Sequence, residues 1–142
     1  MKKIFSLFVA FFVFVAASYA QKGVMKFAQE THDFGKIEQG KPVTHVFEFK
    51  NTGSDPVIIN DAQASCGCTK PSFSREPIMP GKSGSISATF NAAAPGQFTK
   101  TVTVTSNAAA SQAVLYLKGE VVTQKEAQAA TDAKKKSTKT SR

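Results

Sequence analysis

The pattern of apolar and polar positions is clearest in residues 43–50, where the two kinds of side chain alternate. Val43, His45, Phe47 and Phe49 share one phase of this alternation. Because successive side chains of a β-strand point to opposite faces, a period of two predicts a strand with one buried face. We therefore interpret His45 as a histidine of the buried face rather than as a metal ligand.

Similar runs follow one another along most of the chain. We expect further strands in residues 25–29, 31–37, 57–65, 84–90, 98–105 and 113–121. Turn-forming residues separate them, most densely in residues 51–56. The middle of the chain, around Pro71, Pro77 and Pro80, is expected to be irregular.

Seven or eight short strands without a helical pattern predict an all-β protein. Since helical crossovers are absent, the sheets should be mainly antiparallel, and an immunoglobulin-like β-sandwich of about 100 residues is the expected fold. No Trp is present, so phenylalanines must supply most of the large core volume. The phenylalanines available after the N-terminal segment are Phe27, Phe34, Phe47, Phe49, Phe73, Phe90 and Phe98.

The first 20 residues have the pattern of a secretory signal peptide. Lys2 and Lys3 precede an apolar run in residues 4–17, which ends in Ser18-Tyr19-Ala20. The run is shorter than the about 20 residues that a membrane-spanning helix needs, and no cysteine lies at the cleavage point for lipid attachment. We expect cleavage after Ala20, and export to the periplasm or, alternatively, secretion from the cell.

The net charge of +8 is spread unevenly over three expected segments. The signal peptide, residues 1–20, carries +2, and the C-terminal residues 123–142 carry +4. The sandwich domain, residues 21–122, then carries only +2, which does not favour nucleic-acid binding. The Lys- and Ala-rich tail has no apolar face to bury, so we expect disorder or a fluctuating helix. A tether to anionic envelope material is the alternative role for this tail.

The candidate for chemistry is the motif Ser65-Cys66-Gly67-Cys68-Thr69, which holds both cysteines of the chain. Export favours a disulfide between Cys66 and Cys68. In an extended strand their Cα atoms would lie roughly 6.5–7 Å apart, near the upper limit for a disulfide. Gly67 would allow the backbone to bend and bring them closer. The small ring should be easily reduced and should add little to stability.

Two other interpretations of the cysteine pair stay open. Two thiolates could bind Cu(I), whereas zinc would need two more ligands, and His32 and His45 do not stand at a local ligand spacing. A redox-active dithiol is the other possibility, with Lys70 and Arg75 near enough in sequence to stabilise a thiolate. The motif lacks the helix and βαβ context of thioredoxin-like proteins.

Several motifs occur together in an order that is typical of one bacterial family. They are residues 31–37 (THDFGKI), Gly40, residues 47–53 (FEFKNTG), residues 65–69 (SCGCT), residues 78–81 (IMPG) and residues 101–107 (TVTVTSN). With these motifs the chain resembles the bacterial domain of unknown function family 1573 over residues 27–121. The resemblance implies an exported, hydin-like sandwich of immunoglobulin type. It implies no activity, substrate or cofactor.

No motif of a hydrolase, metalloprotease or phosphate-binding loop is present in the sequence. Seven of the acidic residues of the expected domain are scattered, and we interpret them as solvated or turn residues: Asp33, Glu38, Glu48, Asp55, Asp61, Glu76 and Glu120. We therefore expect a non-enzymatic exported envelope protein, an interaction or structural module without a cofactor. Its partner would be an envelope protein or a cell-wall component, bound at the loop from Cys66 to Cys68. The alternative is a small copper-binding or thiol-redox protein that uses these two cysteines.

Overall fold

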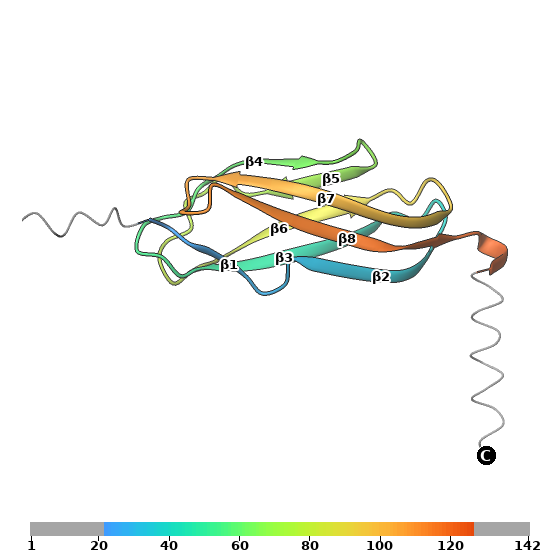
Figure 1. Cartoon of the computed structure of the whole chain (residues 1–142), viewed down its shortest axis with the longest axis horizontal. Coiled ribbons are helices and arrows are strands. Elements are labelled where there is room, and N and C mark those ends of the chain that lie inside the picture. The colour runs from blue at the N-terminus through green and yellow to red at the C-terminus, as the bar shows by residue number, and fades with distance from the viewer. Residues whose placement is uncertain (1–21, 127–142) are drawn as a thin grey trace, which may run out of the picture.

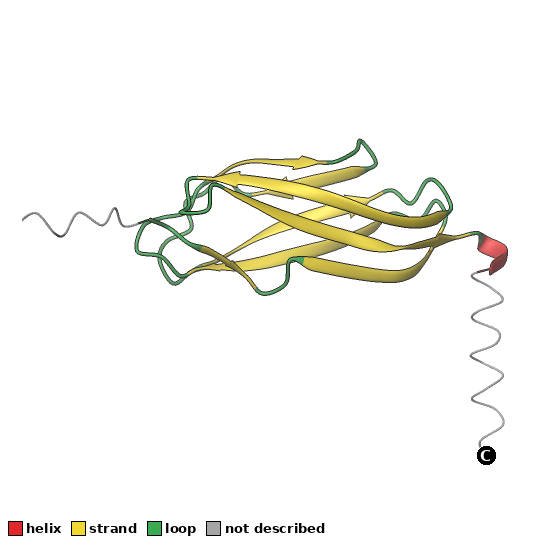
Figure 2. Cartoon of the chain, in the orientation of Figure 1, coloured by secondary structure: helices red, strands yellow, loops and turns green. Residues whose placement is uncertain are grey.

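Two β-sheets packed face to face make up the fold (Figure 1). The computed structural model describes residues 22–126, and strands account for most of this part of the chain (Figure 2). The strands are β1 (Met25–Phe27), β2 (Thr31–Glu38), β3 (Val43–Asn51), β4 (Ile59–Ala64), β5 (Thr69–Phe73), β6 (Ser83–Phe90), β7 (Gly96–Ser106) and β8 (Gln112–Val122). The expected β-sandwich of seven or eight strands is confirmed.

The order of strands is β1-β3-β6-β5 in the first sheet and β2-β8-β7-β4 in the second. All pairs are antiparallel except β2 with β8, which are parallel. A parallel pair needs a long crossover, and here the crossover consists of all the strands from β3 to β7. The expectation of mainly antiparallel sheets therefore holds, with this one exception at the edge of the second sheet.

The core lies between the inner faces of the two sheets. Phe47 and Phe49 of β3 are 1% and 2% exposed, whereas Val46 between them is 47% exposed. Opposite them, β7 and β8 contribute the fully buried side chains Val102, Val104, Leu115 and Leu117. This confirms the buried phase that the alternation predicts for β3 and β7. Among the expected core phenylalanines, Phe90 and Phe98 are buried, and Phe27, Phe34 and Phe73 pack partly buried against the core.

The expectation of an irregular middle is wrong for β5, which contains Pro71. β5 is an edge strand that pairs only with β6, and Pro71 stands opposite Ala88. The N–H of Asn91 donates to the carbonyl of Cys68 at 3.0 Å, so alternation along the antiparallel pair turns the nitrogen of Pro71 away from β6. Proline therefore costs no hydrogen bond of the ladder at this position.

The predicted signal peptide, residues 1–20, lies outside the described residues, as do residues 127–142 of the predicted tail. The last strand, β8, ends at Val122, where the sequence places the end of the domain. Beyond it the N–H and the hydroxyl of Thr123 donate to the carboxylate of Glu126 at 3.0 and 2.8 Å. These hydrogen bonds lower the pKa of Glu126, and they cap a single helical turn.

Candidate functional site

The cysteine motif forms the turn between β4 and β5, where the chain leaves the second sheet and enters the first (Figure 1). We call residues 65–69 the cysteine turn. Both strands that it joins are edge strands. Cys66 and Cys68 are half-buried, and Gly67 between them is exposed.

Cys66 and Cys68 are joined as a disulfide, with their Cα atoms 5.2 Å apart. The backbone bends here, since the N–H of Thr69 donates to the carbonyl of Cys66 at 3.3 Å. The bend does not need a glycine, contrary to the expectation. Gly67 is not among the glycines with positive φ, and a Cβ built on it would meet nothing within 4 Å.

Hydrogen bonds on both flanks hold the cysteine turn against the sandwich. Ser65 exchanges two of them with Thr101 of β7: its N–H donates to the carbonyl at 2.9 Å, and its Oγ accepts from the N–H at 3.1 Å. On the other flank, Asn91 donates to the carbonyl of Cys68. The hydroxyl oxygen of the buried Thr69 lies 3.9 Å from the sulfur of Cys66 and 4.0 Å from that of Cys68. The turn therefore presents a fixed shape.

In the part of the chain that the structure describes, no hydrogen bond or ion pair joins the other candidate residues, Lys70 and Arg75, to the cysteines. Arg75 lies over the ring of Phe73, 6.0 Å from its centroid, and Lys70 is exposed on β5. Within residues 22–126, no three His, Cys, Asp or Glu side chains are close enough to hold a metal ion together. Among the described residues, the copper interpretation therefore has the two sulfur atoms but no third ligand from His, Cys, Asp or Glu.

The two histidines meet each other instead, across the two sheets. His32 of β2 stacks on His45 of β3 with ring centroids 3.6 Å apart and planes 7° from parallel. Phe34 and Phe47 contact the pair edge-on. Burial, and secondly the neighbouring His32, lower the pKa of His45 below its ordinary value of 6.5. The phase of His45 predicted its inward position, but nothing local in the sequence indicates a partner in the other sheet.

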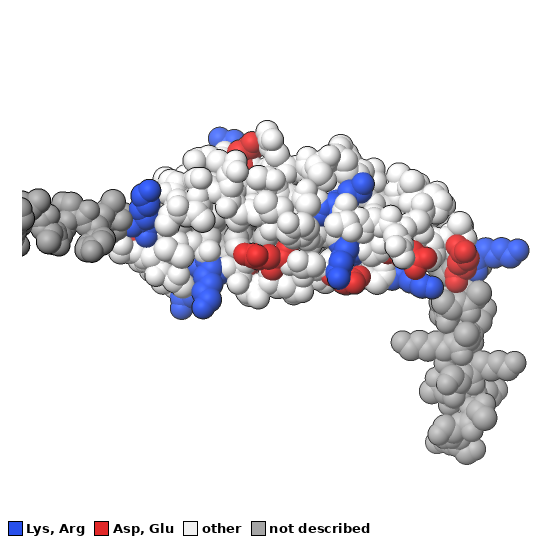
Figure 3. All heavy atoms as spheres, viewed as in Figure 1, with Lys and Arg blue, Asp and Glu red and all other residues white. Residues whose placement is uncertain are grey.

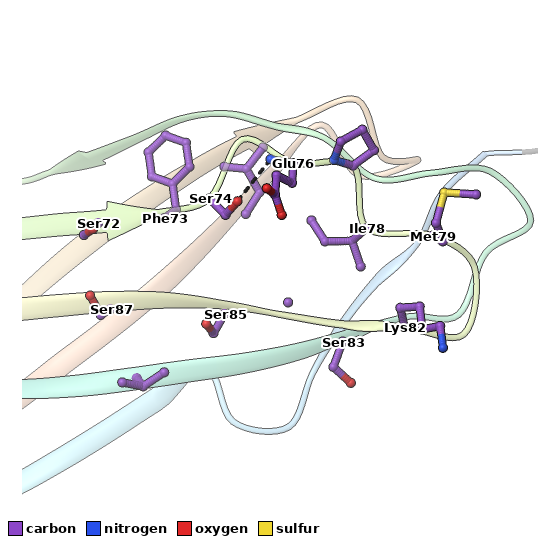
Figure 4. A pocket seen from close by; sticks show the side chains of 14 residues that line it. Ser72, Phe73, Ser74, Glu76, Ile78, Met79, Lys82, Ser83, Ser85 and Ser87 are labelled. Atoms are coloured by element: carbon purple, nitrogen blue, oxygen red, sulfur yellow. Dashed lines mark hydrogen bonds between the residues drawn. The ribbon is translucent and has the colours of Figure 1, made fainter.

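A groove of about 550 Å³ lies between β6 and the segment that follows β5. Figure 4 shows Ser83, Ser85 and Ser87 along β6 on one side, and Phe73, Ser74, Glu76 and Ile78 on the other. Sequence reasoning did not identify this groove. The available signal was the run Ser83-Gly84-Ser85-Ile86-Ser87, in which small hydroxyl residues occupy the whole outer phase of a strand.

Charged residues of both signs lie near one another on the face seen in Figure 3. Within residues 22–126 three ion pairs are formed: Lys36–Glu120, Lys41–Glu38 and Lys118–Asp33. The side chains of Asp33 and Glu120 are 56% and 41% exposed, so such pairs contribute little to stability. In residues 22–126 no helix is long and apolar enough to cross a membrane.

Comparison with known structures gives the fold of the chain but no activity. The chain is similar to a protein of unknown function from Porphyromonas gingivalis W83, with a TM-score of 0.63 and 20% identity; 76% of this chain matches 51% of that one, about half its length. It is similar to the ASH/PapD-like domain 7 of human CEP192, with a TM-score of 0.60 and 12% identity over 72% of this chain and 87% of that one. It is also similar to part of the Vibrio cholerae VesB protease, with a TM-score of 0.59 and 13% identity over 68% of this chain and 32% of that one. Such identities show a shared fold alone.

Among curated proteins no relative matches the chain. A protein-family model described as "Protein of unknown function (DUF1573)" matches residues 25–121, which include all eight strands except the last residue of β8. These are the residues that carry the resemblance in the sequence. Because the match covers more than half of the chain, this protein belongs to the DUF1573 family.

Proposed function

We propose that this protein is an exported, non-enzymatic module of the cell envelope that binds an envelope protein or a cell-wall component. The observation that carries the proposal is the cysteine turn, a half-exposed turn of fixed shape between two edge strands. Loops held on a rigid sandwich are common binding elements. The predicted signal peptide supports export.

The disulfide fixes the shape in which the cysteine turn is exposed to a partner more than it stabilises the fold. A ring closed by cysteines two residues apart removes little chain entropy compared with a long loop. The flanks of the turn are already held by Ser65, Thr101 and Asn91. The bond therefore acts mainly on the exposed part around Gly67, which is the part that a partner would contact.

The test is capture of partners by the mature protein from envelope extract, followed by titration of the purified partner. The Cys66→Ser/Cys68→Ser double variant should lose binding. The matched control is Ala110→Ser, because Ala110 is exposed in the loop between β7 and β8, at the opposite end of β4 from the cysteine turn. Equal binding by the double variant would show that the turn is not the binding site. Loss of binding on deletion of residues 123–142 would move the function to the tail.

The alternative function is that of a small copper-binding or thiol-redox protein. The specific observation in its favour is the Thr69 hydroxyl, which lies against both sulfur atoms and would donate to a thiolate formed on reduction. Mass spectrometry and metal analysis of protein purified from the periplasm distinguish the functions. Metal-free protein that gains two hydrogen atoms on reduction supports the disulfide. Stoichiometric copper that is lost in Cys66→Ser supports the metal site.

A further inference from the structure

The backbone hydrogen-bonding groups of β6 point alternately toward β3 and toward β5. Asn51 at the end of β3 donates to the carbonyl of Lys82 at 2.9 Å, and Asn91 donates to the carbonyl of Cys68, which precedes β5, at 3.0 Å. Since the direction alternates along a strand, Gly84 and Ile86 face β3. By the same alternation Ser83, Ser85 and Ser87 face β5.

β5 does not accompany β6 over its full length. The pairing ends at Phe73 opposite Ile86, and the chain then moves away to pair Ile78 with Val57 through backbone hydrogen bonds of 2.7 and 2.9 Å. Ser83 and Ser85 therefore face the groove instead of a strand. Within residues 22–126 the N–H groups of Ser83 and Ser85 and the C=O group of Ser83 have no backbone hydrogen-bond partner on that side.

We propose that this open edge of β6, at Ser83 and Ser85, receives an extended peptide segment of a partner protein as an additional strand. The inference rests on the proposed function as an interaction module, but it uses a different surface from the cysteine turn. Alternating N–H and C=O groups along a strand edge match the backbone of another extended chain. The groove, which has a volume of about 550 Å³, lies beside these two residues (Figure 4).

The lining of the groove favours a neutral peptide over a polyanion or a sugar. Lys82 and Glu76 are its charged residues and balance each other, and most of the remaining polar groups are serine hydroxyls. The one aromatic ring, Phe73, has Arg75 over it, which hinders stacking of a sugar on that face. Ile59 and Ile78 give the groove an apolar side, so the peptide should place one apolar side chain there.

The decisive variant is Ser85→Pro, which removes the N–H that faces the groove. The ladder with β3 is left intact, because it uses Gly84 and Ile86 rather than Ser85. The matched control is Ser85→Ala, which removes the hydroxyl and keeps the backbone donor. As probe we would select short linear peptides from a random phage-displayed library on the full mature protein, and titrate the synthesised peptides by fluorescence anisotropy.

Selected peptides should bind Ser85→Ala as they bind the wild type, and Ser85→Pro about tenfold more weakly or worse, since a peptide carbonyl is left unpaired. Hydrogen exchange gives a second reading that needs no variant: the Ser85 amide should exchange fast in the free protein and be protected by bound peptide. Equal binding by Ser85→Pro, a Ser85 amide protected without peptide, or a library that yields no binder would each overturn the inference. If peptides bind but neither this edge nor the cysteine turn affects capture of envelope partners, the strand addition stands and the proposed function fails.

Discussion

Strand β6 has a neighbouring strand on each side, but it is paired over its full length with β3 and over only part of its length with β5. Toward β3 the ladder is in register over eight pairs, whereas toward β5 it covers five pairs. The β3 side carries the strict alternation that ends in Phe47 and Phe49, and the β5 side carries Pro71, the cysteine turn and the groove. We infer that a strand with a long apolar alternation pairs with its neighbour over its full length. The surfaces left for a partner lie where that alternation is short.

The largest expected effect comes from the fully paired side of β6, where β3 lies. Phe47→Ala should lower the free energy of unfolding by about 3–5 kcal/mol, because the ring is 1% exposed and its loss leaves a cavity between the sheets. Chemical denaturation of the mature protein measures this change. Val46→Ala is the control on the neighbouring residue, which is 47% exposed; it should change stability by less than about 0.5 kcal/mol. Similar losses in both variants would contradict the assignment of the two faces of β3.

A second prediction compares two glycines, one in β6 facing the core and one in the cysteine turn that precedes β5. Gly84 faces the core, and a Cβ there would lie 2.6 Å from Cζ of the buried Phe49. Gly84→Ala should therefore cost about 1–3 kcal/mol through overpacking. Gly67 in the cysteine turn has open space around it, so Gly67→Ala should be close to neutral. Thermal unfolding of both variants tests this, and a destabilised Gly67→Ala would mean that the turn needs glycine after all.

Burial could be predicted from the sequence where apolar and polar residues alternate along a strand. Phe47 and Phe49 of β3 and Val102 and Val104 of β7 were placed on the inner face by their phase alone. It failed for β5, because Pro71 indicates a break in a strand unless its nitrogen is known to face away from the neighbouring strand. Whether a strand lies at an edge is a property of the sheet order, and local patterns do not encode it.

The same reason explains what was missed at the candidate sites. The nearness of Cys66 and Cys68 follows from their spacing of two residues, so the sequence was sufficient to single them out. The stack of His32 on His45 and the groove beside Ser85 arise where strands from distant parts of the chain meet or separate. Such contacts depend on register between strands, which single-sequence patterns do not fix.

A third and smaller effect is expected at the cysteine turn. The Cys66→Ser/Cys68→Ser double variant should lose about 1.5 kcal/mol of unfolding free energy or less, because the closed ring is so short. Denaturation of the wild type with and without reductant should show the same small change. A loss of several kcal/mol would mean that the disulfide supports the fold, and it would weaken the assignment of a presentation role to the turn.

The smallest expected effect is a pH dependence of the free energy of unfolding that arises from the stack of His32 on His45. The pKa of His45 is lowered in the folded state below the ordinary 6.5, so the unfolded chain takes up a proton more readily. The stability from this group is fully present above pH 6.5, is lost as the pH falls through the folded pKa, and then levels off. Denaturation between pH 7.5 and pH 4.5 should show this loss, and it should be absent in His45→Gln.

The His32→Gln variant separates the two causes of the lowered pKa. Burial is the larger cause and the charge of His32 the smaller one, so NMR titration of His45 in this variant should give a pKa that rises partway toward 6.5 without reaching it. A return to the ordinary value would make repulsion from His32 the main cause. An unchanged value would mean that the stacked rings do not sense each other's charge. In that case β2 and β3 would be held together at this edge by packing alone, including that of Phe34 and Phe47 around the two rings.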